Sequence, residues 1–352
     1  MKPFIFVFLF LICQMQSVFA FIQGTIRDAE TGDPVYMANV FLDKTMVGTT
    51  TNSKGFYTIA NHPVGNLELV VHHIGYDVQL YNMTVQNHDT LTINFLLQAK
   101  VLEGKEIEVV ASRPKEWHKN LKRFTKIFLG ESSAGYHSEI INPQVLDFNY
   151  DKESGILEAK TDYIIEIKNN FLGYDIYALL DDFHWKEIQN RNSKIISDST
   201  SSYFVTELYY QEMQSTDEKQ INKWRKNRSE TYKGSFRHFM ASAARNNLSK
   251  DGFIILYKGY TIPPDSFKIH KTASLDLYTF DNDKVLKVVY TGTRPVQTTA
   301  FKKMSEDVRV DSYGNIYSSD PLAFVRFGKW KLVRCQLAAT GLQSSKLTKG
   351  DL

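Results

Sequence analysis

The sequence contains one spacing of residue types that could hold a catalytic metal ion. His184 and Glu187 form an H-x-x-E pattern, and His238 or His270 could supply a third ligand. Two histidines and a carboxylate are typical ligands of a zinc ion that activates water for peptide hydrolysis. The pattern lies at the end of a predicted strand, however, where an offset of three directs the two side chains to opposite faces. We therefore do not assign a zinc site to it.

The other candidates for chemistry are weaker. His72 and His73 are neighbours in a predicted strand, so their rings point to opposite faces and form a poor site for one ion. Cys335 would need a histidine partner to act as a nucleophile, and a lone buried thiol is more common. The sequence lacks G-x-S-x-G, P-loop and dinucleotide-binding motifs. We predict no catalytic, cofactor-binding or metal-binding residue.

A group of basic residues flanks a predicted break between two helices. Arg225, Arg228, Arg237 and His238 could together bind an anion. A solvated helix face is the more common reason for such a group. Anion binding is therefore the less favoured interpretation.

The first twenty residues have the pattern of a secretory signal peptide. Lys2 is followed by an apolar run from Phe4 to Cys13, which is too short to favour a membrane-spanning helix. Cleavage after Ala20 would remove Cys13 and leave Cys335, so no intramolecular disulfide could form. The alternative interpretation is an uncleaved membrane anchor.

The composition narrows the classes of partner. The net charge is +3, and loss of Lys2 with the signal peptide leaves +2. This near balance favours neither nucleic acid nor a strongly anionic partner, and we expect no nucleic acid. Aromatic residues make up 13% of the chain, as expected for β-rich cores and contact surfaces.

We expect no cofactor, and we expect a protein or glycan partner in the cell envelope.

The chain from Phe21 to Val110 reads as short β-strands separated by turns. We expect strands at Ile22–Arg27, Ala38–Leu42, Gly48–Thr51, Phe56–Ile59, Leu67–Val71, Val78–Val85 and Thr90–Leu97. Turn signals at intervals of about 8–12 residues are typical of a sandwich or barrel. Gly55, in a tight turn, is expected to need a positive φ.

The order of residues across these strands resembles the carboxypeptidase-like regulatory domain, a transthyretin-like β-sandwich of seven strands. The matching positions are Gly24, Ile26, Asp28, Thr31, Gly32, Pro34, Ala38, Asn39, Val40, Gly48, Thr49, Thr51, Gly55, Tyr57, Ile59, Ile74, Gly75 and Tyr76. The resemblance implies an accessory module of exported enzymes, surface proteins and outer-membrane receptors, and it implies no catalysis. It also implies that the glycines and the Ile-Gly-Tyr triplet serve turns and core packing.

A helical period begins after this region. Trp117, Leu121, Phe124 and Phe128 are spaced four, three and four residues apart, which predicts an amphipathic helix from Lys115 that stops at Gly130. The opposite face is basic, with Lys115, Lys119, Lys122, Arg123 and Lys126. A basic helix could lie on an anionic membrane. Packing against the rest of the chain, with a solvated polar face, is favoured.

The remaining segments predict a mixed domain. Residues 157–168 alternate between apolar and polar types, which predicts one continuous strand with a solvated face. Further strands are expected at 173–180, 203–210, 252–257 and 285–290, a polar loop at 189–202, a hairpin at 308–317 and a closing segment at 322–337. A helical region over 217–248 should break at Gly234, with Ser235 as the N-cap of its second half.

The predicted fold class is mainly β with α+β: an N-terminal seven-strand sandwich followed by an α+β domain with an antiparallel sheet. The predicted divisions are a signal peptide at 1–20, the sandwich at 21–112, an α+β domain without an assigned function at 113–337 and a flexible tail at 338–352. The second domain also resembles, more loosely, a block that follows this module in some exported bacterial proteins of unknown role. The matching pieces are Arg123-Phe124, Phe128-Leu129-Gly130, Asn142-Pro143, Leu146-Asp147-Phe148, Leu172-Gly173-Tyr174, Tyr232-Lys233-Gly234-Ser235 and Arg237-His238-Phe239.

These observations favour a non-enzymatic binding or assembly module in the periplasm, at the outer membrane or at the cell surface. The alternative is a zinc-dependent carboxypeptidase-like hydrolase whose site lies in the second domain. Peripheral contact with a membrane stays open, and so do the ligand, the oligomeric state and the cleavage of the signal peptide.

Overall fold

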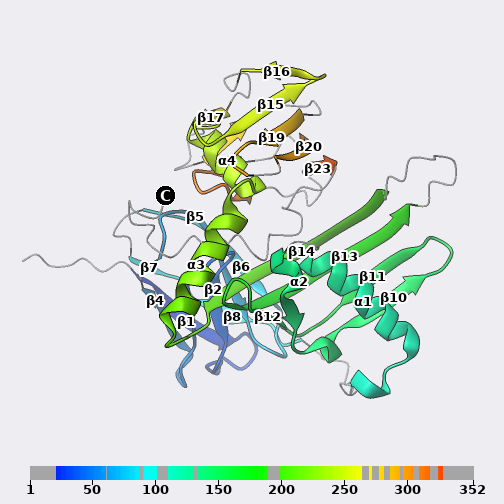
Figure 1. Cartoon of the computed structure of the whole chain (residues 1–352). Coiled ribbons are helices and arrows are strands. Elements are labelled where there is room, and N and C mark those ends of the chain that lie inside the picture. Colours follow the sequence, from blue (N-terminus) through cyan, green and yellow to red (C-terminus); the bar gives the residue numbers. More distant parts are fainter. Residues whose placement is uncertain are drawn as a thin grey trace, which may run out of the picture.

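The structure is a computed structural model of the chain. It describes residues 21–60, 62–86, 90–100, 110–130, 133–188, 199–263, 269–271, 277–280, 286–293, 296–303, 309–317 and 324–327. The predicted signal peptide, both cysteines and the predicted tail lie outside these residues. The described part consists mainly of antiparallel strands with few helices (Figure 1), which confirms the predicted fold class.

The N-terminal unit is built from two sheets. The first contains β1 (Phe21–Asp28), β4 (Phe56–Ala60), β7 (Thr90–Thr92) and β8 (Phe95–Leu97). The second contains, in spatial order, β3 (Gly48–Thr50), β2 (Asn39–Leu42), β5 (Gly65–His72) and β6 (Gln79–Val85). β7 and β8 both pair in parallel with β1, so the strand predicted at 90–97 is interrupted at Ile93 and Asn94. If β7 and β8 are counted as one interrupted strand, the two sheets together form the predicted seven-strand sandwich.

The inward side chains of the two sheets form one core. Ile22, Ile26 and Tyr57 meet Val40 and Leu69 in a cluster whose members are almost fully buried. Alternation along each strand places these residues on one face, because successive side chains in a strand point to opposite sides. The sandwich therefore has its own hydrophobic core.

Several motif residues organise the turns of the sandwich. The Asp28 carboxylate accepts the backbone N–H groups of Glu30 and Thr31 and the hydroxyl of Tyr76. These backbone hydrogen bonds, followed by the tyrosine hydroxyl, lower the pKa of Asp28 because they stabilise its charged form. Gly55 has φ +72°, as predicted. Ile74 lies in the turn after β5, and half of its surface is exposed.

Gly24 permits the close approach of two strands. A Cβ at this position would lie 1.7 Å from the Ile93 carbonyl oxygen, which belongs to the backbone and has little freedom to move. We expect Gly24→Ala to lower the free energy of unfolding of the sandwich by about 1–3 kcal/mol, measured by urea denaturation. Thr58→Ala, at an exposed position of the neighbouring β4, is the control and should change it by less than about 0.5 kcal/mol. Equal effects of the two substitutions would contradict the close-contact argument.

The second unit is a large antiparallel sheet. Its strands are β9 (Ser138–Ile140), β10 (Asp147–Asp151), β11 (Ile156–Lys160), β12 (Ile165–Asn169), β13 (Tyr174–Ile188) and β14 (Ser199–Glu212). β13 is central: β14 pairs along one side of it, and β11 and β12 pair with its two halves on the other side. The start of β14 at Ser199 falls inside the segment that was predicted as a loop, since backbone pairing with β13 outweighs the polar composition there.

The continuous strand predicted at 157–168 is wrong in one respect. The structure has two strands, β11 and β12, separated by a turn in which the Thr161 hydroxyl oxygen accepts the backbone N–H of Tyr163. Both strands still direct the predicted residues inward, and Leu157 and Ile165 are fully buried. The alternation correctly predicts the inward residues of β11 and β12, whereas Thr161 and Tyr163 lie in the turn between the two strands.

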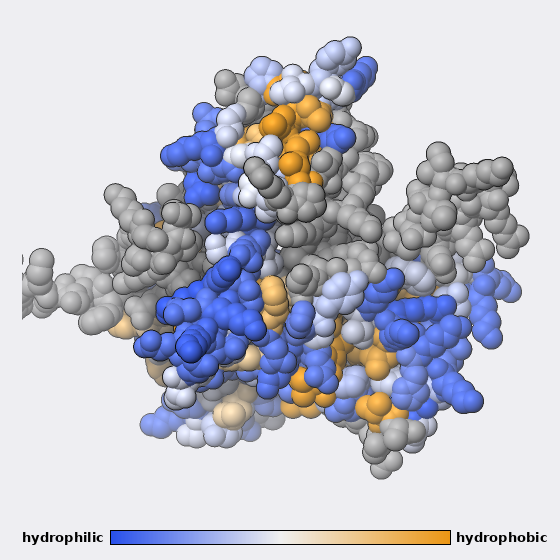
Figure 2. Space-filling model, viewed as in Figure 1, coloured by the Kyte–Doolittle hydropathy of each residue, from blue (hydrophilic) through white to orange (hydrophobic). Residues whose placement is uncertain are grey.

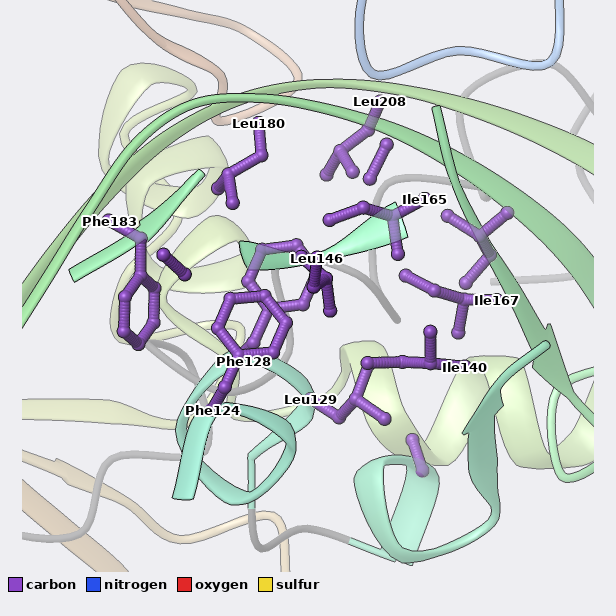
Figure 3. Close-up of a cluster of buried hydrophobic side chains, with 14 of the residues drawn as sticks. Phe124, Phe128, Leu129, Ile140, Leu146, Ile165, Ile167, Leu180, Phe183 and Leu208 are labelled. Atoms are coloured by element: carbon purple, nitrogen blue, oxygen red, sulfur yellow. The ribbon is translucent and has the colours of Figure 1, made fainter. Parts of the chain in front are cut away.

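Helix α1 (Lys115–Leu129) covers the inward face of this sheet. Figure 3 shows Phe124, Phe128 and Leu129 of α1 packed against strand residues such as Ile165 and Leu180. The helix ends at Gly130, which has φ +79°. This packing confirms the favoured interpretation of the helix. The short elements α2 (Ser133–Tyr136), η1 (Val110–Ser112) and η2 (Pro143–Val145) lie beside it in the chain.

Two further helices follow the large sheet. They are α3 (Glu218–Tyr232) and α4 (Phe236–Ala244), and the chain breaks between them as predicted. The Asp217 side chain accepts the N–H of Lys219 at the start of α3, and the Ser235 hydroxyl accepts the N–H of His238 at the start of α4. Ser235 is therefore an N-cap, because it satisfies an N–H group that the helix leaves free.

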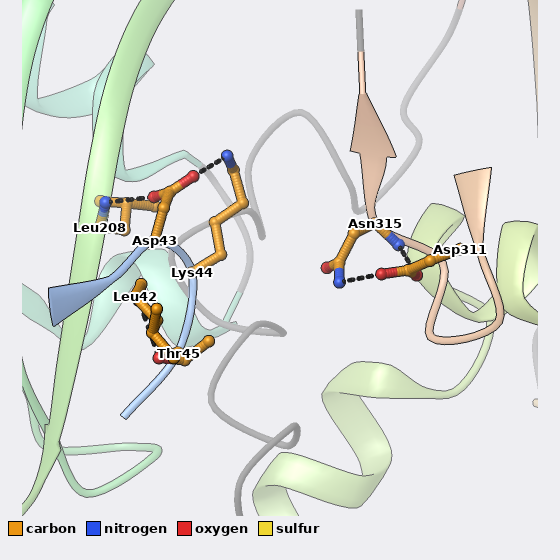
Figure 4. Close-up of polar contacts among 7 residues, drawn as sticks. All are labelled: Leu42, Asp43, Lys44, Thr45, Leu208, Asp311 and Asn315. Carbon is orange, nitrogen blue, oxygen red and sulfur yellow. Dashed lines mark hydrogen bonds and ion pairs between the residues drawn. The ribbon is translucent and has the colours of Figure 1, made fainter. Parts of the chain in front are cut away.

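The C-terminal strands form two smaller sheets. One has the order β16 (Tyr260–Ile262), β15 (Phe253–Tyr257), β19 (Leu286–Tyr290), β20 (Gln297–Lys303) and β23 (Phe324–Phe327). The other has β17 (Ile269–Lys271), β18 (Leu277–Phe280), β21 (Arg309–Asp311) and β22 (Ile316–Tyr317). β21 and β22 form the predicted hairpin, and within its turn Asp311 accepts a hydrogen bond from the Tyr313 N–H. Asp311 also accepts hydrogen bonds from Asn315 (Figure 4).

These strands and α4 share a hydrophobic cluster of their own. Phe236 and Phe239 of α4 pack with Phe253, Val288 and Val310, apart from the cluster under α1. The region expected to contain a single antiparallel sheet thus contains two separate cores. The reason lies in the break after α3, which gives α4 a different set of strands to cover.

The sandwich joins the large sheet through the turn after β2. The Lys44 N–H donates to the Leu208 carbonyl at 2.8 Å, and the Tyr210 N–H donates to the Thr45 carbonyl at 3.0 Å. The Leu208 N–H donates to a carboxylate oxygen of Asp43 at 2.9 Å (Figure 4). β14 is an edge strand, and this turn satisfies backbone groups that the edge would otherwise expose. We call this contact the joint.

Candidate functional site

The outward face of the large sheet, opposite α1, carries a polar and aromatic surface. Along β12 and β13 the residues that alternate with the buried ones are exposed or half-buried. Glu166 lies opposite Tyr177, and Tyr177 lies opposite Tyr209 on β14. In the neighbouring row Lys168, Asp175 and Gln211 follow the same order. The outer platform, as we name it, consists of Ile141, Glu166, Lys168, Asp175, Tyr177, Tyr209 and Gln211.

The two tyrosines form the centre of the outer platform. Their ring centroids are 5.9 Å apart with an interplanar angle of 28°, and the Tyr177 hydroxyl donates to the Gln211 side-chain oxygen at 3.4 Å. Burial, followed by the negative charges of Asp175 and Glu166, raises the pKa of Tyr177. The hydroxyl therefore stays protonated at neutral pH and can act as a hydrogen-bond donor.

A shallow depression runs along one side of this surface. Its volume is about 230 Å³, and it is lined by Ile141, Glu166, Ile167, Lys168, Asp175, Ile176 and Tyr177. The lining combines two carboxylates, an ammonium group, a phenol and three isoleucines. Such a surface can stack against a flat apolar group and can donate and accept hydrogen bonds around it.

The outer platform continues into the joint. Tyr209 packs against Phe41 of the sandwich, with ring centroids 5.6 Å apart. Phe41, Val70 and Leu179 form a small buried cluster that Tyr209 partly covers. The sandwich thus holds one end of the platform in place.

The residues considered for zinc are not brought together. His184 lies on β13, where its Nε2 is 2.9 Å from Asp182 and its Nδ1 is 3.5 Å from Glu158. The backbone of Glu187 pairs with that of Thr200 further along the same strand. His238 lies in α4 and His270 in β17 of a smaller sheet. Across the described residues, no group of three or more histidine, cysteine, aspartate or glutamate side chains is arranged to hold a metal ion.

His238 occupies an aromatic environment. The rings of Tyr232, Phe253 and Tyr290 lie within 4.9–5.6 Å of its imidazole, and its Nδ1 accepts the Gly234 N–H. Burial lowers the pKa of His238 to about 4, so the ring is neutral near pH 7. Its contacts explain it as a packing residue of the α4 core.

The basic residues considered for an anion site are also separated. Arg225 is exposed on α3. The visible surface over this helix is mainly hydrophilic (Figure 2). Arg228 is buried and donates to the carbonyls of Leu172 and Gly173. Arg237 donates to the Tyr313 carbonyl in the β21–β22 hairpin. Arg228 and Arg237 therefore bind different parts of the backbone rather than one shared anion.

The outer platform was not identified from the sequence. The alternation in β12 could have marked Glu166 and Lys168 as outward residues. The tyrosine pair could not be found in this way, because Tyr177 and Tyr209 are separated by a segment whose length does not determine the strand register.

Comparison with known proteins supports the assignment of the first unit. Residues 22–109 match the family model described as a CarboxypepD_reg-like domain, so the resemblance stated from the sequence is confirmed for this part of the chain. No curated protein matches the sequence. None of the helices in the described part of the chain is both long and apolar enough to span a membrane.

Three solved structures show low similarity. A candidate membrane-associated protein of unknown function from Bacteroides fragilis is 14% identical over 82% of this chain and 91% of that chain, with a TM-score of 0.19. A DUF3823 family protein from Bacteroides uniformis is 10% identical over 56% and 85% of the two chains, with a TM-score of 0.18. A 9R-lipoxygenase from Cyanothece is 12% identical over 66% and 49%, with a TM-score of 0.18. These TM-scores are too low to support an argument.

Proposed function

We propose that this protein is a non-enzymatic binding or assembly protein of the cell envelope, exported to the periplasm or the cell surface, and that the outer platform binds its partner. The observation that carries the proposal is the stacked pair of Tyr177 and Tyr209, which lies on the outward face of the large sheet beside polar residues. The regulatory-type sandwich at residues 22–109 supports an accessory rather than a catalytic role.

The shape of the outer platform favours an extended partner. The depression is shallow, and two of the residues that line it, Glu166 and Lys168, are exposed. Small ligands are usually enclosed in clefts that bury most of their surface. A polypeptide or glycan chain, in contrast, can lie across a sheet face and contact the two rings in succession. This agrees with the protein or glycan partner expected from the sequence.

Tyr177→Ala tests the proposal. Removing a central aromatic anchor commonly costs about 2 kcal/mol or more of binding free energy, so we expect capture of the partner to fall at least about tenfold. The full-length exported protein would be immobilised, and the proteins and glycans captured from the native envelope would be compared between wild type and variant. Circular dichroism would verify that the fold is retained.

Tyr36→Ala is the matched control for this experiment. Tyr36 is a tyrosine of the sandwich that is 58% exposed and lies outside the outer platform. We expect its substitution to leave capture unchanged. Partners that are retained by Tyr177→Ala and lost from Tyr36→Ala would place binding on the sandwich and would refute the assignment of the outer platform.

A further inference from the structure

The joint gathers three carboxylates around one ammonium group. Asp43 and Lys44 belong to the turn after β2, Glu68 belongs to β5, and Glu207 faces them from β14. The Asp43 side chain is 5% exposed and Glu207 is 8% exposed. One carboxylate oxygen of Asp43 accepts the Leu208 N–H, and the other contacts the Lys44 ammonium group. Both Asp43 oxygens therefore have partners in the docked arrangement.

Lys44 occupies a position that would suit glycine. Its φ of +56° places it in the left-handed region, which is unfavourable for a residue with a long side chain. Its N–H donates across the joint to Leu208, a contact that glycine could make equally well. A lysine at this strained position indicates that the ammonium group itself is needed, because it is the cation that faces Asp43, Glu68 and Glu207.

The charge balance at the joint depends on Glu207. With all groups ionised, a single positive charge would face three negative charges, and the side chains of Asp43 and Glu207 are almost fully buried. Burial, followed by the negative charge of Asp43, raises the pKa of Glu207 to about 7, although Lys44 acts in the opposite direction. The pKa of Glu68 is raised by the same two causes in the same order. Burial lowers the pKa of Lys44, but the carboxylates outweigh it and the net shift is upward.

We propose that the joint is an acid-strengthened latch, in which protonation of Glu207 favours docking of the sandwich onto β14. When the joint opens, water reaches Glu207 and the negative charge of Asp43 moves away, so the carboxyl returns towards its ordinary acidity. The docked state therefore binds a proton that the open state releases. Docking is strongest below the ordinary glutamate pKa of 4.5 and weakens as the pH rises through about 7. Lys44 remains charged throughout this range.

The latch has a consequence for the neighbouring surface. Tyr209 contacts Phe41 across the joint and stacks on Tyr177 of the outer platform. Opening the joint would remove the contact between Tyr209 and Phe41 and expose the small apolar cluster of Phe41, Val70 and Leu179. The latch is argued from the joint alone and does not depend on what the outer platform binds.

Hydrogen exchange of the full-length protein tests the latch. The amides of Lys44, Leu208 and Tyr210 donate across the joint, so their protection reports docking directly. Protection would be measured between pH 5.5 and 8.5 after correction for the intrinsic exchange rate at each pH. We expect protection of these amides to fall at least about tenfold towards high pH, since one unit of pKa difference corresponds to a tenfold change in the docking equilibrium. The amides of β12 serve as the reference and should not change.

Two variants identify the groups responsible. Glu207→Gln should keep the joint protected at pH 8.5 and remove the pH dependence, because the amide is neutral at every pH. Lys44→Met should weaken protection at least about tenfold at pH 7.5 by removing the cation. Glu230→Gln, an exposed glutamate of α3, is the matched control and should behave like wild type. Circular dichroism would confirm folding of each variant.

The latch would be refuted by either of two results. One is wild-type protection at the joint that stays constant or increases as the pH rises. The other is a pH dependence in Glu207→Gln equal to that of Glu230→Gln. If Glu207→Gln does not fold, the wild-type profile and Lys44→Met still decide the matter, because stable docking of Lys44→Met at pH 7.5 would exclude an electrostatic latch.

Discussion

Phe124→Ala should lower the free energy of unfolding of the large sheet by about 3–5 kcal/mol, because it would leave a cavity at the centre of the core under α1. Phe124 is fully buried. Its ring centroid lies 4.8 Å from that of Phe128 and 4.7 Å from that of Phe183, so it joins the helix to the sheet. These neighbours are held by their own strands and helix and cannot collapse fully into the space.

Urea denaturation followed by near-ultraviolet circular dichroism would measure this effect. Because the described chain contains separate cores, the transition of the large sheet should shift while that of the sandwich stays nearly constant. Tyr136→Ala is a suitable control, since Tyr136 lies in the neighbouring α2 and is 71% exposed. It should change the free energy of unfolding by less than about 0.5 kcal/mol. A small effect of Phe124→Ala would show that α1 does not stabilise the sheet.

Arg228→Ala is expected to have the second-largest effect, a loss of about 2–4 kcal/mol of stability. The Arg228 Nε donates to the Leu172 carbonyl at 2.7 Å and its Nη2 donates to the Gly173 carbonyl at 3.0 Å. The guanidinium also pairs with Glu212 and lies 3.9 Å from the centroid of the Tyr174 ring. Truncation would leave the Leu172 carbonyl without this donor in a buried turn, and the Gly173 carbonyl would keep only the Met213 N–H. Glu212 is 43% exposed and can be hydrated, which keeps the loss below that of a fully buried pair.

Arg225→Ala provides the matched comparison on the same helix. Arg225 is exposed, so its removal should change stability by less than about 0.5 kcal/mol in a urea titration. The pair of variants also tests the anion hypothesis derived from the sequence. A shared anion site would make inorganic phosphate stabilise the wild type and neither variant. We expect phosphate to leave the stability unchanged, because Arg228 already has backbone and carboxylate partners.

The local features of this fold were readable from the sequence. The helix at Lys115–Leu129, its end at Gly130 and the N-cap at Ser235 each depend on residues within one or two turns of one another. The inward residues of β11 and β12 followed from the alternation of apolar and polar types. The sandwich could be predicted because its turn residues recur at short intervals and match a known family over residues 22–109.

The candidate site and the joint were decided by tertiary structure. Tyr177 meets Tyr209 only through the register of β13 and β14, and Asp43 meets Leu208 across a separation of 165 residues. No local pattern encodes these contacts, because they depend on which strand edge the sandwich covers and on how far each strand extends. His184, His238 and His270 illustrate the same point in reverse. Their spacing along the chain suggested a shared site, but they lie in three different elements, β13, α4 and β17. The topology of the sheets, and not the spacing, determines which side chains meet.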